Sequence, residues 1–273
     1  MHAAPSGGID TPGDVRNFRL DIQYDGSAFY GWARQPGQIT VEGSLEQALA
    51  TYFGHEVSLS VAGRTDSGVH ARGQVAGLVL PGGVVRERGL DAPENRGRAL
   101  VALRALTPPG LMVMKMEPAS PDFDARRSAL ARSYRYFVWR GLVPSPFLAA
   151  YSWHVKGDLD VDLMARAAEL MLGRHDFTAF TPTETHHQHF EPTIERCRWR
   201  RRGPLVWLDV RAPHFLRHMV RTMVGTMVAV GKGRLELERL AEILEGAARA
   251  DAGPTAPPHG LFLWRIHYAR PLP

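Results

Sequence analysis

The stretch "VSLSVAGRTDSGVHARGQVAGLVL", residues 57–80, holds two apolar segments separated by a polar loop. Val57, Leu59 and Val61 alternate with serines, which is typical of a half-buried strand, and apolar residues return between 74 and 80. The loop between them carries Asp66, a single carboxylate among glycines, with Arg64 two residues before it. The stretch therefore predicts two strands, 57–63 and 74–80, that present a short charged loop.

The flanking segments complete a βαββαβ order. A strand is predicted at 18–26, ending in the turn pair Asp25-Gly26, and a helix with regularly spaced apolar residues at 41–54. A second helix, 95–106, and a fourth strand, 111–117, follow the quoted stretch. This order predicts a ferredoxin-like split unit, a four-stranded antiparallel sheet with two helices on one face.

The second half repeats this theme with longer connections. Its expected elements are a strand at 133–141, a helix at 160–173, two strands within 194–212, helices at 215–231 and 235–246, and a last strand at 261–269. We predict an α+β fold of two ferredoxin-like, RRM-like halves, with the antiparallel sheets joined into one extended sheet, helices packed on one face, and a central cleft. The predicted division is a disordered tail, 1–15, an N-terminal domain with the aspartate loop, 16–118, and a C-terminal domain, 119–273.

Composition limits the classes of protein. The chain has 273 residues, 44% of them apolar, enough for a sizeable core. No run approaches the roughly 18 to 20 apolar residues that span a bilayer, and the start has no signal-peptide pattern, so we expect a cytoplasmic protein without a membrane partner. The single cysteine, Cys197, cannot form an internal disulfide and is expected to be passive.

Arginine supplies nearly all of the positive charge. The formal net charge is +5, and only Lys115, Lys156 and Lys232 are lysines among 33 basic residues. Guanidinium groups bind phosphates through paired hydrogen bonds and stack on bases, so this balance suits a nucleic-acid partner. A GC-rich genome would also enrich arginine, and composition alone leaves both explanations open.

The segment 215–230 is predicted to be an amphipathic helix. Its apolar residues gather on one side, and His214, Arg217, His218 and Arg221 gather on the other. Cations in the first two turns of a helix are disfavoured by its dipole. The pattern therefore indicates a facing carboxylate or phosphate, with a merely solvated face as the alternative.

The loop itself allows two interpretations. Thr65 to Gly68 could form a simple turn in which Asp66 bonds its own backbone and Gly68 has a positive φ. Alternatively, Asp66 is a nucleophile on a rigid strand end, with Arg64 as its basic neighbour. The spacing alone does not decide between them.

The residues 62–75, "AGRTDSGVHARGQV", resemble the signature loop of the TruA family of tRNA pseudouridine synthases, Gly-Arg-Thr-Asp-Ala-Gly-Val-His followed by Gly-Gln. Five other stretches fit the same family in order: "YDGSAFYGWARQ", "FDARRSALARSYRY", "GRHDFTAF", "FLRHMVRTMVG" and "TAPPHGLFLW". The resemblance extends essentially from Phe18 to Tyr268. The resemblance implies isomerisation of uridine to pseudouridine in the tRNA anticodon stem-loop, at positions 38, 39 and/or 40. It also implies a homodimer, with one tRNA spanning both subunits, and no cofactor.

The resemblance also implies roles for individual residues. Asp66 corresponds to the catalytic aspartate, which attacks either C1′ or C6 while the base is detached, turned and rejoined through C5. Tyr134 corresponds to the aromatic residue that lies against the uracil and is a candidate acceptor of the C5 proton. Arg221 corresponds to the basic residue that pairs with the aspartate, which would stabilise its ionised form. The predicted substrate-binding residues are Arg64, which holds the place of the flipped-out nucleotide, Arg217 and His218.

Other motifs carry weaker signals. "RCRWRRR", residues 196–202, is either an RNA-contacting strand with an interleaved tryptophan or a solvated hairpin with Trp199 in the core. No Walker, Rossmann or His-Glu-x-x-His pattern is present, and we predict no metal site, although His186, His187 and His189 cluster in one loop.

Three positions depart from the family pattern: Ser67 in place of alanine, Glu191-Pro192 where an arginine often precedes Thr-Ile, and Ala71-Arg72 beside the loop. Two other functional classes compete with the synthase hypothesis. A non-catalytic RNA-binding protein would not need Asp66, and an aspartate-dependent hydrolase or phosphotransferase would need a metal-binding carboxylate cluster beside it.

Overall fold

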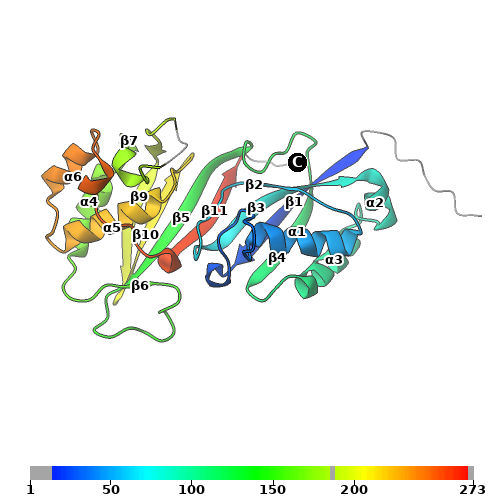
Figure 1. The fold of residues 1–273 in the computed structure, drawn as a ribbon, viewed down its shortest axis with the longest axis horizontal. Coiled ribbons are helices and arrows are strands. Elements are labelled where there is room, and N and C mark those ends of the chain that lie inside the picture. Colours follow the sequence, from blue (N-terminus) through cyan, green and yellow to red (C-terminus); the bar gives the residue numbers. More distant parts are fainter. Residues whose placement is uncertain (1–13, 185–187, 270–273) are drawn as a thin grey trace, which may run out of the picture.

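The computed structural model describes residues 14–184 and 188–269 (Figure 1). Within these residues a nine-stranded sheet runs in the order β4-β1-β3-β11-β5-β10-β9, with β2 beside β3 and β6 beside β5. The pairs β3–β11 and β5–β6 are parallel and the other pairs are antiparallel. The prediction of an α+β fold with one large, mostly antiparallel sheet is confirmed. The ferredoxin-like halves, the single helical face, the central cleft and the domain boundary at 118 stay predictions.

The first half contributes the β4 end of the sheet. Its elements are β1 (Val15–Tyr24), α1 (Val41–Phe53), β2 (Leu59–Val61), β3 (His70–Pro81), α2 (Gly82–Glu87), α3 (Pro93–Leu106) and β4 (Leu111–Ala119). In β1, Phe18, Leu20 and Ile22 are buried because alternate side chains of a strand share one face. The Thr40 side chain caps α1 at its start, and Gly54 ends it in the left-handed conformation.

The second half contributes the β9 end. Its elements are β5 (Ala129–Trp139), β6 (Trp153–His154), α4 (Val161–Leu170), β7 (Gly173–Arg174), β8 (Thr193–Ile194), β9 (Arg196–Arg202), β10 (Leu205–Ala212), α5 (Met219–Gly231), α6 (Leu237–Ile243) and β11 (Leu261–Tyr268). β7 and β8 form a separate two-stranded sheet. Figure 1 shows β11, in red, between β5 and β3, so a strand from the end of the chain joins the two halves.

The buried apolar residues form two clusters. One combines side chains of β1, β3, β4, α1 and α3, and the other combines β5, β9, β10, α4, α5 and α6. Tyr134, on the central strand β5, packs against both clusters. The region around Tyr134 is therefore where the two cores meet.

The start of α5 differs from the sequence-based expectation. The helix begins at Met219 and not at 215, and His218 before it has φ of 60°, a left-handed conformation held by no other non-glycine residue among those described. Phe215 and Leu216 still pack on the core, so their spacing imitates one more helical turn. His214, Arg217 and His218 consequently precede the helix, and only Arg221 lies in its first turn.

Two further predictions, on the N-terminal tail and on membrane-spanning segments, can be compared only with the described residues. Residues 1–13 of the predicted tail lie outside them, and Val15 already belongs to β1. Across 14–184 and 188–269, no helix is both long and apolar enough to cross a membrane.

Candidate active site

Asp66 lies in the loop that joins β2 to β3. The Val69 N–H donates to the Asp66 carbonyl oxygen at 3.1 Å, and Gly68 has φ of +76°, so the segment is a turn, as the simpler interpretation expected. The backbone closes that turn, and the side chain has its partners outside it. Its Oδ2 accepts a hydrogen bond from Arg221 Nη1 at 3.3 Å, while 30% of the side chain remains exposed. The carboxylate is therefore paired and still accessible.

A buried network fixes the backbone of this loop. Gln74 is fully buried, and its Nε2 donates to the Gly63 carbonyl oxygen at 2.7 Å. The Tyr24 hydroxyl and Thr65 Oγ1 share a hydrogen bond of 2.8 Å, and the Trp32 N–H donates to the Thr65 carbonyl oxygen at 3.0 Å. Burial raises the pKa of Tyr24 to about 12, so its phenol stays protonated. The loop is held on both sides of Arg64, which gives the glutamine of the signature a physical role.

Arg221 reaches Asp66 from the first turn of α5. Its Nε donates to the Ala256 carbonyl oxygen at 2.8 Å, and the Ala256 N–H donates back to the Arg221 carbonyl oxygen at 3.1 Å. The segment that precedes β11 therefore orients the guanidinium, which also bonds the Asp66 carboxylate. A cation in this first turn opposes the helix dipole, and the facing Asp66 charge offsets that cost. The carboxylate expected opposite this helix is present.

His218 is the second basic neighbour of Asp66. Its Nε2 lies 3.6 Å from Asp66 Oδ2. Burial lowers the pKa of His218, the Asp66 charge opposes that shift, and the charges of Arg221, Arg217 and Arg249 add to it. The imidazole beside the carboxylate is therefore neutral at neutral pH.

Tyr134 approaches the same loop from β5. A Cβ placed on Gly63 would lie 3.9 Å from the Tyr134 hydroxyl, and the ring packs edge-on against Phe215 at 5.2 Å. Burial raises the pKa of Tyr134 far above its usual value, the charge of Asp66 raises it further, and the charge of Arg132 opposes the shift. The phenol is thus protonated in the resting site, close enough to Asp66 to sense its charge.

Arg132 is a residue that sequence reasoning missed. Its guanidinium donates five hydrogen bonds to backbone carbonyl oxygens, those of Ala62, twice, Pro213, Ala129 and Arg126. Ala62 precedes the Asp66 loop and Pro213 precedes α5, so one side chain ties both halves of the site together. The sequence signal that could have found Arg132 is its position in the strand, two residues before Tyr134 and therefore on the same face.

The remaining predicted residues lie around this centre. Arg64 is exposed on the Asp66 loop, and Arg217 is exposed in the turn before α5. Trp199 is only 6% exposed and its Nε1 contacts Met227 Sδ at 3.2 Å, so it belongs to the core and cannot stack on a base. Cys197 is buried as well, and burial raises its pKa to about 12, in line with a passive thiol.

The other sequence signals have these outcomes. His186 and His187 lie outside the described residues, and the described part of the chain holds no group of three potential metal ligands. Glu191, which departs from the family pattern, pairs with Arg174 at 2.5 Å. Arg72 lies over the Trp264 ring, 4.7 Å from its centroid.

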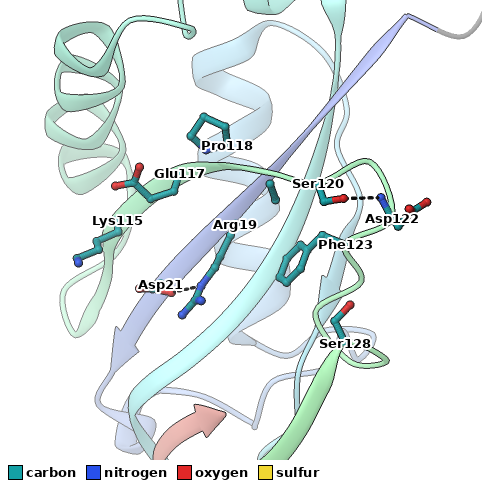
Figure 2. Close-up of a pocket in the computed structure, with 10 residues that line it drawn as sticks. Arg19, Asp21, Lys115, Glu117, Pro118, Ser120, Asp122, Phe123 and Ser128 are labelled. Carbon is teal, nitrogen blue, oxygen red and sulfur yellow. Dashed lines mark hydrogen bonds and ion pairs between the residues drawn. The ribbon is translucent and has the colours of Figure 1, made fainter. Parts of the chain in front are cut away.

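A large cavity lies away from this centre. Figure 2 shows its lining on β1, β4 and the loop before β5, including Arg19, Asp21, Lys115 and Phe123, and its volume is about 750 Å³. It contains none of the predicted site residues. The convergence of Asp66, Arg221, His218 and Tyr134 therefore locates the candidate site, and cavity size does not.

Comparison with known proteins identifies the family. Residues 167–269 match the family described as tRNA pseudouridine synthase. A Moorella thermoacetica protein named tRNA pseudouridine synthase A is 39% identical over 252 residues, which cover 92% of this chain and 98% of the relative. The chain belongs to this family. Proteins of the same name from Acidiphilium cryptum, 41% identical over 256 residues, and Bacillus licheniformis, 38% identical over 252 residues, cover 93% and 92% of this chain and 97% and 98% of their own. The predicted resemblance and the isomerase class are confirmed.

Proposed function

We propose that this enzyme converts uridine to pseudouridine in the anticodon stem-loop of tRNA, at position 38, 39 and/or 40. The observation that carries the proposal is the Asp66–Arg221 pair, an accessible carboxylate on a rigid loop facing a guanidinium from a distant helix. The names of the relatives, tRNA pseudouridine synthase A, support tRNA as the substrate. The positions within the stem-loop rest on the motif resemblance.

In the proposed mechanism Asp66 is the nucleophile. Arg221 stabilises its ionised form, and the carboxylate attacks C1′ of the ribose or C6 of the uracil. The N1–C1′ bond breaks, the base turns, a C5–C1′ bond forms, and the bond from Asp66 to C1′ or C6 breaks to return the free carboxylate. C5 then loses a proton and N1 gains one, so the atoms balance without an oxidant or another co-reactant. Tyr134, beside the loop, packs against the uracil in this proposal. Its phenol is protonated in the resting site, so it must lose that proton before it can accept one from C5.

A uridine in a stem must leave the base stack before it reaches Asp66. Extrusion costs a few kcal/mol, which backbone contacts have to offset. Arg64, exposed beside Asp66, is suited to fill the space that the base vacates. Arg217 and His218, in the turn before α5, are suited to hold the adjacent phosphates. The target base would occupy a central cleft where the two cores meet at Tyr134.

We further infer a cytoplasmic homodimer in which one tRNA contacts both subunits. The inference rests on the family resemblance and is supported by a partly exposed aromatic surface on the sheet. This surface comprises Phe137, Trp207 and Trp264, with the Arg135 guanidinium 3.9 Å from the Trp264 ring centroid. Rings of this kind are enriched where protein surfaces associate.

The proposed activity is tested with tRNA transcripts that carry tritium at C5 of uridine. The enzyme should release tritium to water without added cofactor, and mapping should place pseudouridine in the anticodon stem-loop. Tight RNA binding with no release, over a range of tRNAs and salt concentrations, would instead support the non-catalytic RNA-binding protein. Pseudouridine outside the stem-loop would overturn only the assignment of positions.

Replacement of Arg221 should slow chemistry without unfolding the chain. Charged hydrogen bonds contribute about 1.5–3 kcal/mol, so Arg221→Ala should lose roughly 10- to 100-fold in single-turnover rate. Arg221→Lys keeps the charge but loses the Nε–H bond to Ala256. Its single-turnover rate should lie between those of the wild-type enzyme and Arg221→Ala. Arg239→Ala, at an exposed position of α6, removes ion pairs to Glu242 and Asp251 and is the matched control. Global unfolding of Arg221→Ala in a thermal melt would indicate a structural role.

A further inference from the structure

We propose that His70 is a positioning residue, which holds the segment 256–260 and thereby keeps Arg221 against Asp66. The effect on turnover rests on the proposed function, whereas the geometric role does not. His70 is the first residue of β3 and is 1% exposed, so it cannot touch a substrate. Its contribution must pass through its neighbours.

The two ring nitrogens have distinct partners. The Gly26 N–H donates to Nδ1 at 3.0 Å, and because a backbone N–H can only donate, Nδ1 is the accepting nitrogen. The His259 carbonyl oxygen can only accept, so Nε2 carries a proton and donates to it at 3.1 Å. Burial lowers the pKa of His70 and favours this neutral form, while the charge of Asp25, whose Oδ1 is 3.1 Å from Nδ1, opposes the shift. Tyr151 packs beside the ring, and its hydroxyl donates to Asp25 Oδ2 at 2.8 Å.

These contacts close a path around the candidate site. From His259 the chain leads three residues back to Ala256, whose carbonyl oxygen and N–H both bond Arg221. Arg221 bonds Asp66, and the Asp66 carbonyl oxygen accepts from the N–H of Val69, the neighbour of His70. The Arg221 side of the ion pair is thus linked to the imidazole through residues 256–259, and the Asp66 side is linked to the backbone beside His70 through Val69.

The segment between His259 and Ala256 is suited to transmit position. It contains Pro257 and Pro258, whose rings fix φ and limit local adjustment. The Tyr136 hydroxyl also donates to the Pro257 carbonyl oxygen at 2.8 Å. A shift at His259 should therefore move Ala256, and with it the Arg221 guanidinium.

Two substitutions separate this role from simple filling of the core. His70→Gln can place an amide N–H near the position of Nε2 and keep the bond to His259. His70→Asn can place an amide oxygen near Nδ1 and keep only the bond to Gly26. We expect His70→Gln to keep the single-turnover rate within about threefold, and His70→Asn to lose about tenfold or more with an unchanged tRNA Kd. Similar losses in both variants, in proportion to lowered melting temperatures, would overturn the proposal in favour of a filling role.

A second readout needs no substrate. The Arg221 Nε–H, bonded to Ala256, should give a slowly exchanging NMR signal, assigned by its loss in Arg221→Lys. The signal should persist in His70→Gln and exchange rapidly in His70→Asn. His267→Asn is the control, because this half-buried histidine on β11 bonds Ser133 Oγ at 2.8 Å, outside the path. An unchanged signal in His70→Asn would overturn the positioning role. If the variants give the expected signals but the wild-type enzyme does not isomerise uridine, only the proposed function is overturned.

Discussion

Asp66→Asn should reduce uridine isomerisation by about 10⁴-fold or more, because an amide cannot act as the nucleophile. The side chains have nearly the same shape, and the amide oxygen can still accept from Arg221 Nη1, so the loop should keep its conformation. tRNA binding should remain, since the proposed RNA contacts come from Arg64, Arg217 and His218. Single-turnover tritium release and filter binding on the same preparation measure both quantities.

Asp21→Asn is a matched control for this substitution. Asp21 also pairs with an arginine, Arg19, at 2.7 Å, and its side chain is 32% exposed, close to that of Asp66. The control should keep its rate within about twofold, since a partly exposed ion pair contributes little. Substantial turnover by Asp66→Asn, with deamidation excluded by mass spectrometry, would contradict a nucleophilic role.

Gly225→Ala should be strongly destabilising although it adds a single methyl group inside a helix. A Cβ on Gly225 would lie 1.6 Å from the Pro254 carbonyl oxygen, so either α5 or the segment 253–256 must move. Forced overpacking against backbone should lower the free energy of unfolding by about 3 kcal/mol. Turnover per folded molecule should also fall, because Ala256, which orients Arg221, belongs to the displaced segment. Urea denaturation and single-turnover rates provide the measurements.

Gly97→Ala tests the same change without the contact. Gly97 is inside α3, and a Cβ there would meet nothing within 4 Å. Alanine has the higher helix propensity, so this variant should gain up to about 1 kcal/mol. Equal stabilities for the two variants would show that the segment after α6 yields easily, and would weaken its proposed part in orienting Arg221.

The elements with clear local signals could be predicted from the sequence. α1 has a capping threonine and a terminal glycine, and β9 and β10 alternate on either side of Gly203-Pro204. α2 is too short for a periodic signal, and the start of α5 was predicted too early because Phe215 and Leu216 pack in phase with the helix. Local pattern therefore determines the type of an element better than its ends.

The site was predictable only in part. The cationic first turn of α5 indicated a facing anion, and the family resemblance named Asp66 as that partner. The contacts of Arg132 with Ala62 and of His70 with His259 join residues 70 and 189 positions apart, and no periodicity reports on such distances. The arginines around Trp199 were compatible with a residue that stacks on RNA. Only its burial in the folded chain shows that it belongs to the core.

β11 follows every other described strand in the chain, so the sheet stays divided between β3 and β5 until β11 has been synthesised. This strand pairs with β3 on one side and β5 on the other, and the residues just before it hold Arg221. Leu261, Leu263 and Ile266 of β11 also belong to the two cores, so a nascent chain that lacks residues 256–268 completes neither core and leaves the Arg221 Nε–H without its Ala256 partner. Under the proposed mechanism, the Asp66–Arg221 pair is therefore fully oriented only after residues 256–268 have been synthesised and have paired with β3 and β5.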